Sequence, residues 1–238
     1  MKRFGVIVLV YALTLFVSCA TTGTEDRIVK ATAYYKIGIS YLNENKVQQA
    51  FVEFHKAYEL DPNNKEVLNA IGYIYLIHFD EPQKAIDYFS RAVKVYPDYS
   101  DAYNNMGYAY EKSGNFDKAI FFYKKTLSNP LYPSAQMTFI NLGNSYYRLG
   151  KFNDALVTFK EAIKRDPGFF LPYMKLALCY NAMGKYGDAS TAIMQGITLD
   201  QTYKGDKEKA TEDLNTKKLR ATGYEEQDIR DYLEILKY

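Results

Sequence analysis

The side chains in this sequence that could take part in specific chemistry are mainly amides and phenols that recur at related positions. The amides are Asn104, Asn105, Asn141 and Asn144, and the tyrosines beside them are Tyr73, Tyr108 and Tyr147. A side-chain amide both donates and accepts hydrogen bonds, and a tyrosine ring offers stacking area with a polar tip. A peptide backbone presents a donor and an acceptor at every residue. This set therefore suits the binding of a peptide segment.

Residue types that carry catalysis are sparse. The chain has two histidines, His55 and His78, and neither has a metal-ligand spacing to a cysteine or a carboxylate. No glycine-rich loop that could cradle a phosphate is present, and the carboxylates are scattered over the helical segments. The sequence therefore predicts no catalytic residue, no metal or cofactor site and no small-molecule substrate. We do not expect an enzyme.

The segment 100–133 shows which elements position these side chains. Large apolar residues lie along one face of a first helix, and a second helix follows the turn at Gly114. The small residues Gly107 and Ala119 allow the two helices to pack closely. The apolar residues of this unit are Tyr103, Met106, Tyr110 and Tyr123. The segment therefore predicts a helix-turn-helix unit.

The same frame recurs with a period of about 34 residues. It predicts five units, over 31–64, 65–99, 100–135, 136–169 and 170–203. The small residue of the first helix is in turn Gly38, Gly72, Gly107, Gly143 and Ala177. This pattern over 31–203 resembles the tetratricopeptide repeat (TPR). The resemblance implies an all-α fold, a right-handed solenoid of five repeats.

In a TPR stack the first helices line a concave groove, so the resemblance also implies which residues would bind a peptide. They are Tyr35, Asn69, Tyr73, Asn104, Asn105, Tyr108, Lys112, Asn141, Asn144, Tyr147 and Arg148. A groove that is only solvated is the alternative. The basic clamp of chaperone-binding repeats is absent, since Tyr35 and Ile39 stand at its first two positions.

The N-terminal segment has the pattern of a signal peptide. Lys2 and Arg3 precede an apolar run over 4–17 that is short for a membrane span. The sequence at 16–19, Phe-Val-Ser-Cys, resembles a bacterial lipobox. This implies removal of 1–18, lipidation of Cys19, and a linker over 19–30. The expected location is the periplasmic face of the outer membrane of a Gram-negative bacterium. Cleavage after Ala20, giving a soluble periplasmic protein, is the alternative.

The charge balance limits the partners. The chain has 30 basic and 28 acidic residues, and without Lys2 and Arg3 the two numbers are equal. A nucleic-acid partner would need a basic stripe, so none is expected, and membrane contact would be through the lipid alone. The other cysteine, Cys179, lies on a helical face and is expected to be a buried thiol.

Three stretches depart from the repeat frame. Asp80 is expected to cap the helix that Pro82 begins. The prolines at 130 and 133 bar helix and predict an extended corner between repeats three and four. In the segment 204–238, helices over 207–220 and 225–236 are expected, with a thin apolar side on the first that includes Leu219. We expect this helix pair to cap the fifth repeat, and a partner-binding tail is the alternative.

A lipobox before tandem repeats is similar to the type IV pilus biogenesis lipoproteins of the PilF and PilW type, the pilotins. The more specific likeness is the corner Asn129-Pro130-Leu131-Tyr132-Pro133 followed by Asn141-Leu142-Gly143. It implies an outer-membrane scaffold that assists a secretin or another pilus-assembly component. Two other classes fit as well. One is an adaptor like NlpI for peptidoglycan hydrolases or proteases, and the other is an outer-membrane assembly component like BamD.

Overall fold

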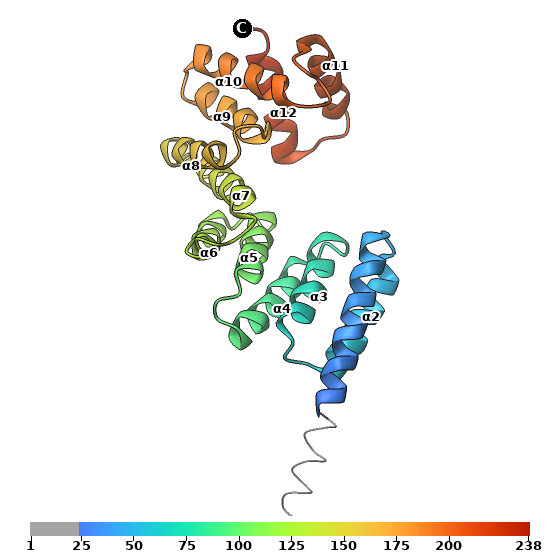
Figure 1. Cartoon of the computed structure of the whole chain (residues 1–238). Coiled ribbons are helices and arrows are strands. Elements are labelled where there is room, and N and C mark those ends of the chain that lie inside the picture. Colours follow the sequence, from blue (N-terminus) through green and yellow to red (C-terminus); the bar gives the residue numbers. More distant parts are fainter. Residues whose placement is uncertain (1–23) are drawn as a thin grey trace, which may run out of the picture. The chain divides into compact units, whose positions relative to one another are not determined.

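The computed structural model describes residues 24–238, and these form helices joined by turns, without a strand in that range (Figure 1). The expected all-α class and its helix-turn-helix repeats are confirmed. None of the helices in this range is long and apolar enough to cross a membrane. The signal peptide and Cys19 lie outside the described residues. The described part of the chain divides into two compact units, with the boundary between residues 102 and 103.

The first unit contains repeats one and two. Residues 24–43 are helical and pair with α2 (Val47–Leu60), and α3 (Lys65–Ile77) pairs with α4 (Pro82–Val95). The linker that we expected up to residue 30 is wrong over 24–30, because the first helix already includes these residues. Once a helix is nucleated, each added residue gains a backbone hydrogen bond. Arg27 also donates from Nη2 to the carbonyl of Leu60 at 3.3 Å, which holds this part against the end of α2.

The core of each of the first four repeats is built on a glycine under an aromatic ring. A methyl group on Gly72 of α3 would lie 2.6 Å from Cε1 of Phe89 of α4, closer than real Cβ atoms approach. Phe89 itself is fully buried. The same pairing joins Gly38 to Phe54, Gly107 to Tyr123 and Gly143 to Phe159. The glycine lets the second helix lie close enough for its ring to fill the space between the two helices.

The turn between α3 and α4 holds one residue more than the other repeats. Asp80 takes a φ of 53°, in the left-handed region that short polar side chains tolerate. Glu81 therefore stands before the helix and Pro82 is its first residue. The expected cap by Asp80 is wrong, because its backbone reverses the chain one residue before the cap position. Pro82 lies in the first turn of the helix, as expected.

The second unit contains three repeats and a C-terminal helix pair. Its helices are α5 (Ser100–Lys112), α6 (Phe116–Leu127), α7 (Ala135–Arg148), α8 (Phe152–Arg165), α9 (Leu171–Ala182), α10 (Tyr186–Leu199), α11 (Lys207–Lys218) and α12 (Gly223–Ile235). Figure 1 shows α9 and α10 followed by α11 and α12 at the C-terminal end of this unit. A continuous buried cluster extends from repeat four through repeat five into the final helices.

The proline corner between α6 and α7 forms turns and not the extended segment that we expected. The amide of Leu131 donates to Oδ1 of Asn129 at 3.1 Å, and the amide of Tyr132 donates to the Asn129 carbonyl at 3.2 Å. Asn129 thus folds the chain back through its side chain and its backbone. Tyr132 is buried by this reversal, while Leu131 is 86% exposed.

The C-terminal helices pack against the fifth repeat. Six apolar residues of the pair are buried, namely Ala210, Leu214, Ile229, Tyr232, Ile235 and Leu236. Helix α12 contacts α9, α10 and α11. Leu219, which we expected on the apolar side of the first helix, is 86% exposed. Helix α11 ends at Lys218, so Leu219 lies in the following turn and no longer follows the helical face.

Candidate protein-binding surface

The predicted groove residues of the first unit lie on the first helices of repeats one and two. Tyr35 is half-buried, with its ring 5.8 Å from that of Phe54, and burial raises the pKa of its hydroxyl. Asn69 is half-buried on α3, and Tyr73, one turn further on, is 37% exposed. The ring of Tyr73 meets that of His78 edge to face at 6.3 Å. These side chains offer partly exposed polar and aromatic area along two helices.

In the second unit, two of the four predicted asparagines bond to the neighbouring repeat. Oδ1 of Asn104 on α5 accepts from the hydroxyl of Thr138 on α7 at 2.8 Å. Nδ2 of Asn144 on α7 donates to Oε1 of Glu111 on α5 at 2.6 Å. Both contacts hold repeat three against repeat four. Asn105 and Asn141 are half-buried on the same two helices.

Glu111 is a further residue of the candidate surface, and the sequence analysis did not include it. Its Oε2 accepts from the hydroxyl of Tyr123 at 2.7 Å, while Oε1 accepts from Asn144. Burial raises the pKa of this carboxyl, and the two hydrogen bonds partly oppose that effect. Glu111 stands next to the predicted Lys112 at another groove position of the repeat. Applying the groove positions to every residue of repeat three would have found it.

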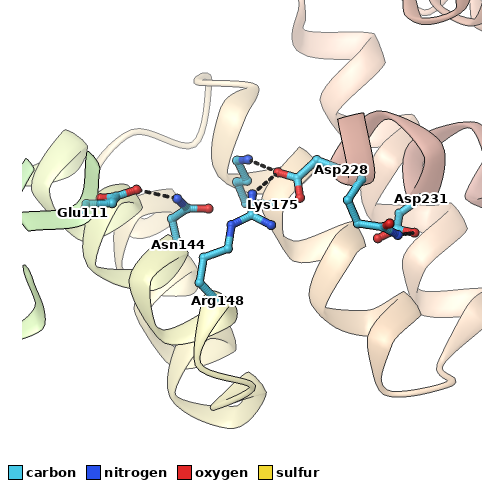
Figure 2. A network of polar contacts seen from close by, with 7 residues as sticks. Glu111, Asn144, Arg148, Lys175, Asp228 and Asp231 are labelled. Atoms are coloured by element: carbon cyan, nitrogen blue, oxygen red, sulfur yellow. Dashed lines mark hydrogen bonds and ion pairs between the residues drawn. The ribbon is translucent and has the colours of Figure 1, made fainter. Parts of the chain in front are cut away.

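A buried ion-pair cluster lies at repeats four and five. Oδ2 of Asp228 on α12 accepts from Nη2 of Arg148 on α7 at 2.7 Å and from Nζ of Lys175 on α9 at 2.9 Å (Figure 2). The side chains of Arg148, Lys175 and Asp228 are 9%, 19% and 7% exposed. Oδ1 of Asp228 is buried without a hydrogen-bond partner. Lys175 and Asp228 were also missed, although Lys175 occupies the same groove position in repeat five as Asn141 does in repeat four.

Aromatic rings extend this contact toward repeat three. The guanidinium of Arg148 lies 4.7 Å from the ring centre of Tyr224 and 5.3 Å from that of Tyr147. The ring of Tyr224 meets that of Phe116 at 5.8 Å. Burial raises the pKa of the Tyr147 hydroxyl, with Asp228 adding to the effect. The N-terminal part of α12 thus reaches side chains of repeats three and four.

Besides the asparagines, the predicted groove residues of the second unit fall into two groups. Tyr147 and Arg148 lie in the contact with α12, whereas Tyr108 is half-buried against the core of repeat three and Lys112 is exposed at the end of α5. A cavity of about 460 Å³ lies between α12 and the repeats. Its lining includes Arg148, Met174, Lys175, Tyr203, Asp228 and Ile229.

Of the remaining reactive side chains, Cys179 is buried, His55 is half-buried and His78 is exposed. His55 packs edge to face against Phe51 at 4.5 Å, and burial lowers the pKa of its ring. Cys179 is fully buried, and burial raises the pKa of its thiol to about 12. Within residues 24–238, no group of three His, Cys, Asp or Glu side chains could hold a metal ion. The arrangement described above is suited to binding polar and charged segments.

The chain belongs to the tetratricopeptide repeat family. Sequence patterns of this family match residues 31–64, 65–99, 100–129, 137–169 and 172–203, which make up more than half of the chain. Domains of this family are protein-interaction scaffolds, and the paired helices described above are their structural unit. Proteins of this family bind peptide segments or protein partners, which makes the repeats the candidate binding surface of this chain.

Two solved structures of similar fold come from type IV pilus proteins. The structure of PilF from Pseudomonas aeruginosa is 20% identical, has a TM-score of 0.66, and is matched over 86% of this chain and 98% of PilF. The structure of PilW, described as a type IV pilus biogenesis factor, is 20% identical with a TM-score of 0.67. That match covers 85% of this chain and 90% of PilW. At this identity, the likeness shows the fold.

One protein that is similar in sequence is named as a photosystem assembly protein, and not as a pilus protein. The photosystem I assembly protein Ycf3 of Synechococcus sp. (strain CC9605) is 30% identical over 112 residues. The match covers 42% of this chain and 64% of that protein. In the first curated relatives the matched segment spans less than two thirds of their own length.

Proposed function

We propose that this chain is a lipid-anchored scaffold of the outer membrane that assists the assembly or stability of a type IV pilus and its secretin. The observation that carries the proposal is the extent of the likeness to PilF. It covers 86% of the chain, more than the five repeats alone occupy, and nearly all of PilF. The fold of the repeats together with part of the flanking chain is therefore similar to a pilus protein.

Two features of the sequence support the same proposal. The pattern at 16–19 is similar to a lipobox and lies N-terminal to the repeats, which begin at residue 31. The corner 129–133 holds the proline and tyrosine residues that pilotins carry at this place. Its buried Tyr132 and exposed Leu131 make it a defined surface feature between α6 and α7. A scaffold tethered by Cys19 would act on envelope proteins close to the membrane.

The first experiment is affinity capture of a tagged full chain from envelope extracts of the bacterium that makes it. A secretin or another pilus-assembly component should be retained. Replacing Asn105 and Asn141 together with alanine should weaken capture by about 1–3 kcal/mol, the cost of unpaired polar groups at an interface. The matched control is Asn153→Ala, an exposed asparagine on α8, the second helix of repeat four. Its capture should equal that of the unaltered chain.

The captured proteins also decide between the related functions. Peptidoglycan hydrolases or proteases would replace the pilus function by that of an adaptor similar to NlpI. Barrel-assembly proteins would replace it by a role similar to that of BamD. If the double asparagine variant captures partners as well as the unaltered chain does, those two residues are not part of the binding site. The contact would then have to lie elsewhere, with the 129–133 corner as the next region to alter.

A further inference from the structure

Helix α12 has the composition of an acidic amphipathic helix. It carries five carboxylates and a single basic residue, Arg230. The carboxylates are Glu225, Glu226, Asp228, Asp231 and Glu234. Its opposite side is apolar and buried through Ile229, Tyr232 and Ile235. Such a helix presents a charged edge and an apolar face together, which is the pattern of segments that dock into helical grooves.

The surface beneath α12 is complementary in charge. Arg148 and Lys175 come from the first helices of repeats four and five, the helices that face the groove in this family. Both cations converge on one oxygen of Asp228 (Figure 2). The Arg148 guanidinium also lies over the ring of Tyr224. Two cations on adjacent first helices form a site for a carboxylate from a segment lying across them.

The fit of α12 to this surface is incomplete. Oδ1 of Asp228 has no hydrogen-bond partner, although the residue is 5% exposed. The hollow of about 460 Å³ is open to solvent and is lined by α9, α11, α12, the 200–203 turn and Arg148 of α7. A segment larger than α12 would therefore find further surface to contact beside Arg148 and Lys175. A buried acceptor without a partner weakens an association. Another segment could bring its own carboxylate with both oxygens hydrogen-bonded, and could also fill the hollow. Such a segment would bind this surface more tightly than α12 does.

We propose that Arg148 and Lys175 form a docking site for an acidic amphipathic helix of a partner protein, and that α12 occupies this site until the partner displaces it. The proposal rests on the scaffold function proposed above and specifies the chemistry of the partner. A short turn over 219–222 joins α12 to α11, and Gly223 begins α12 with a φ of 59°. A tethered helix competes at an effective concentration in the millimolar range, so a partner must bind tightly to replace it.

The test uses a synthetic peptide of residues 223–238 as the probe, labelled for fluorescence anisotropy, and the full chain as the receptor. In the unaltered chain the resident α12 should block the probe. Asp228→Ala removes the carboxylate that holds α12, so probe affinity should rise by about tenfold or more as the free site becomes populated. Adding Lys175→Ala to Asp228→Ala should cancel that gain. A probe with scrambled sequence should not show it.

The matched control is Glu226→Ala. It removes another carboxylate of α12, whose ion pair is with Arg230 of the same helix and not with the repeats. The control should bind the probe as weakly as the unaltered chain does. Equal probe affinity for the unaltered chain and a folded Asp228→Ala variant would overturn the proposal. Equal binding of the scrambled probe would overturn it too, because the site would then lack specificity.

Hydrogen exchange of the unaltered chain provides a second test that needs no variant. If α12 leaves its site while the repeats stay folded, its amides should exchange at least about tenfold faster than those of α9 and α10. Exchange of α12 together with these helices as one unit would show a fixed cap and would overturn the proposal. The probe measures occupancy of the site, whereas affinity capture identifies the partner. If α12 proves to be a fixed cap but a secretin is captured, the docking proposal fails and the proposed scaffold function still holds.

Discussion

Glycine at the eighth position of a repeat contacts an aromatic ring of the second helix, and this contact is testable at a single residue. A methyl group on Gly143 would lie 2.5 Å from Cε1 of Phe159, which is fully buried. Gly143→Ala should therefore lower the free energy of unfolding by about 1–3 kcal/mol, because the ring has to move out of a packed core. Urea unfolding followed by circular dichroism measures the effect.

The matched control for that substitution is Gly187→Ala. Gly187 lies in α10, where a methyl group would meet no atom within 4 Å. Alanine there should be neutral or should stabilise by up to about 1 kcal/mol, since it restricts the unfolded chain. Similar losses of stability in the two variants would contradict the role of ring contact.

The buried carboxyl of Glu111 predicts a pH effect. Its pKa is raised in the folded protein, chiefly by burial. Between the unfolded and folded pKa values the folded state binds more protons, so stability from this group falls as the pH rises through that interval. The unaltered chain should therefore lose stability relative to Glu111→Gln as the pH rises from 5 to 7. The quantity to measure is the unfolding free energy of the unaltered chain minus that of the variant, and it should decrease over this range.

Glu161→Gln, on α8, is the control for the loss of a glutamate elsewhere in the repeats. A difference for Glu111→Gln that grows with pH would mean that the ionised carboxylate is stabilised on folding. In that case the hydrogen bonds from Tyr123 and Asn144 would outweigh burial.

At the scale of the helices, α12 contributes to the apolar core as well as to the ion-pair cluster. Ile235 is fully buried in the cluster that joins repeats four and five to the final helices. Ile235→Ala should lower the free energy of unfolding of the second unit by about 2–5 kcal/mol, because it leaves a cavity. Leu219→Ala is the control and should change it by less than about 0.5 kcal/mol, since Leu219 is 86% exposed. A small effect at Ile235 would mean that α12 is not docked in solution.

The repeat helices could be predicted from sequence because each position has a fixed role within the frame. The glycine at position eight and the ring at position twenty-four follow from local spacing, and the structure pairs them. The turns at Asp80 and at 129–133 were predicted less well, since backbone φ and side-chain hydrogen bonds decide them. The periodicity of the sequence does not predict the backbone φ angles or the side-chain hydrogen bonds of these turns.

The candidate site was predicted in part for a similar reason. The frame places Asn144 and Arg148 on the first helix of repeat four, where the structure has them. Their partners Glu111 and Asp228 come from other elements, and Asp228 lies 80 residues beyond Arg148. Contacts over such distances depend on how the final helices pack, which a repeat pattern does not encode.

At the scale of the whole molecule, we predict that a lipid on Cys19 anchors the protein to the membrane. Mass spectrometry of the N-terminal peptide should find a lipidated Cys19 as the first residue. Cys19→Ala should move the protein from the membrane fraction to the soluble periplasm, or leave an uncleaved precursor, because the acyl chains supply the membrane affinity. An unmodified N-terminus at Thr21 would instead indicate cleavage after Ala20. The repeats should keep the same helical content in both forms.

The pairing of Arg148 and Lys175 with Asp228 also bears on truncated forms of the chain. A polypeptide cut before residue 228 would contain all five repeats but lack the carboxylate that both cations contact. Repeats four and five would then carry an uncompensated positive site, which would be open to any anion that fits between the two side chains.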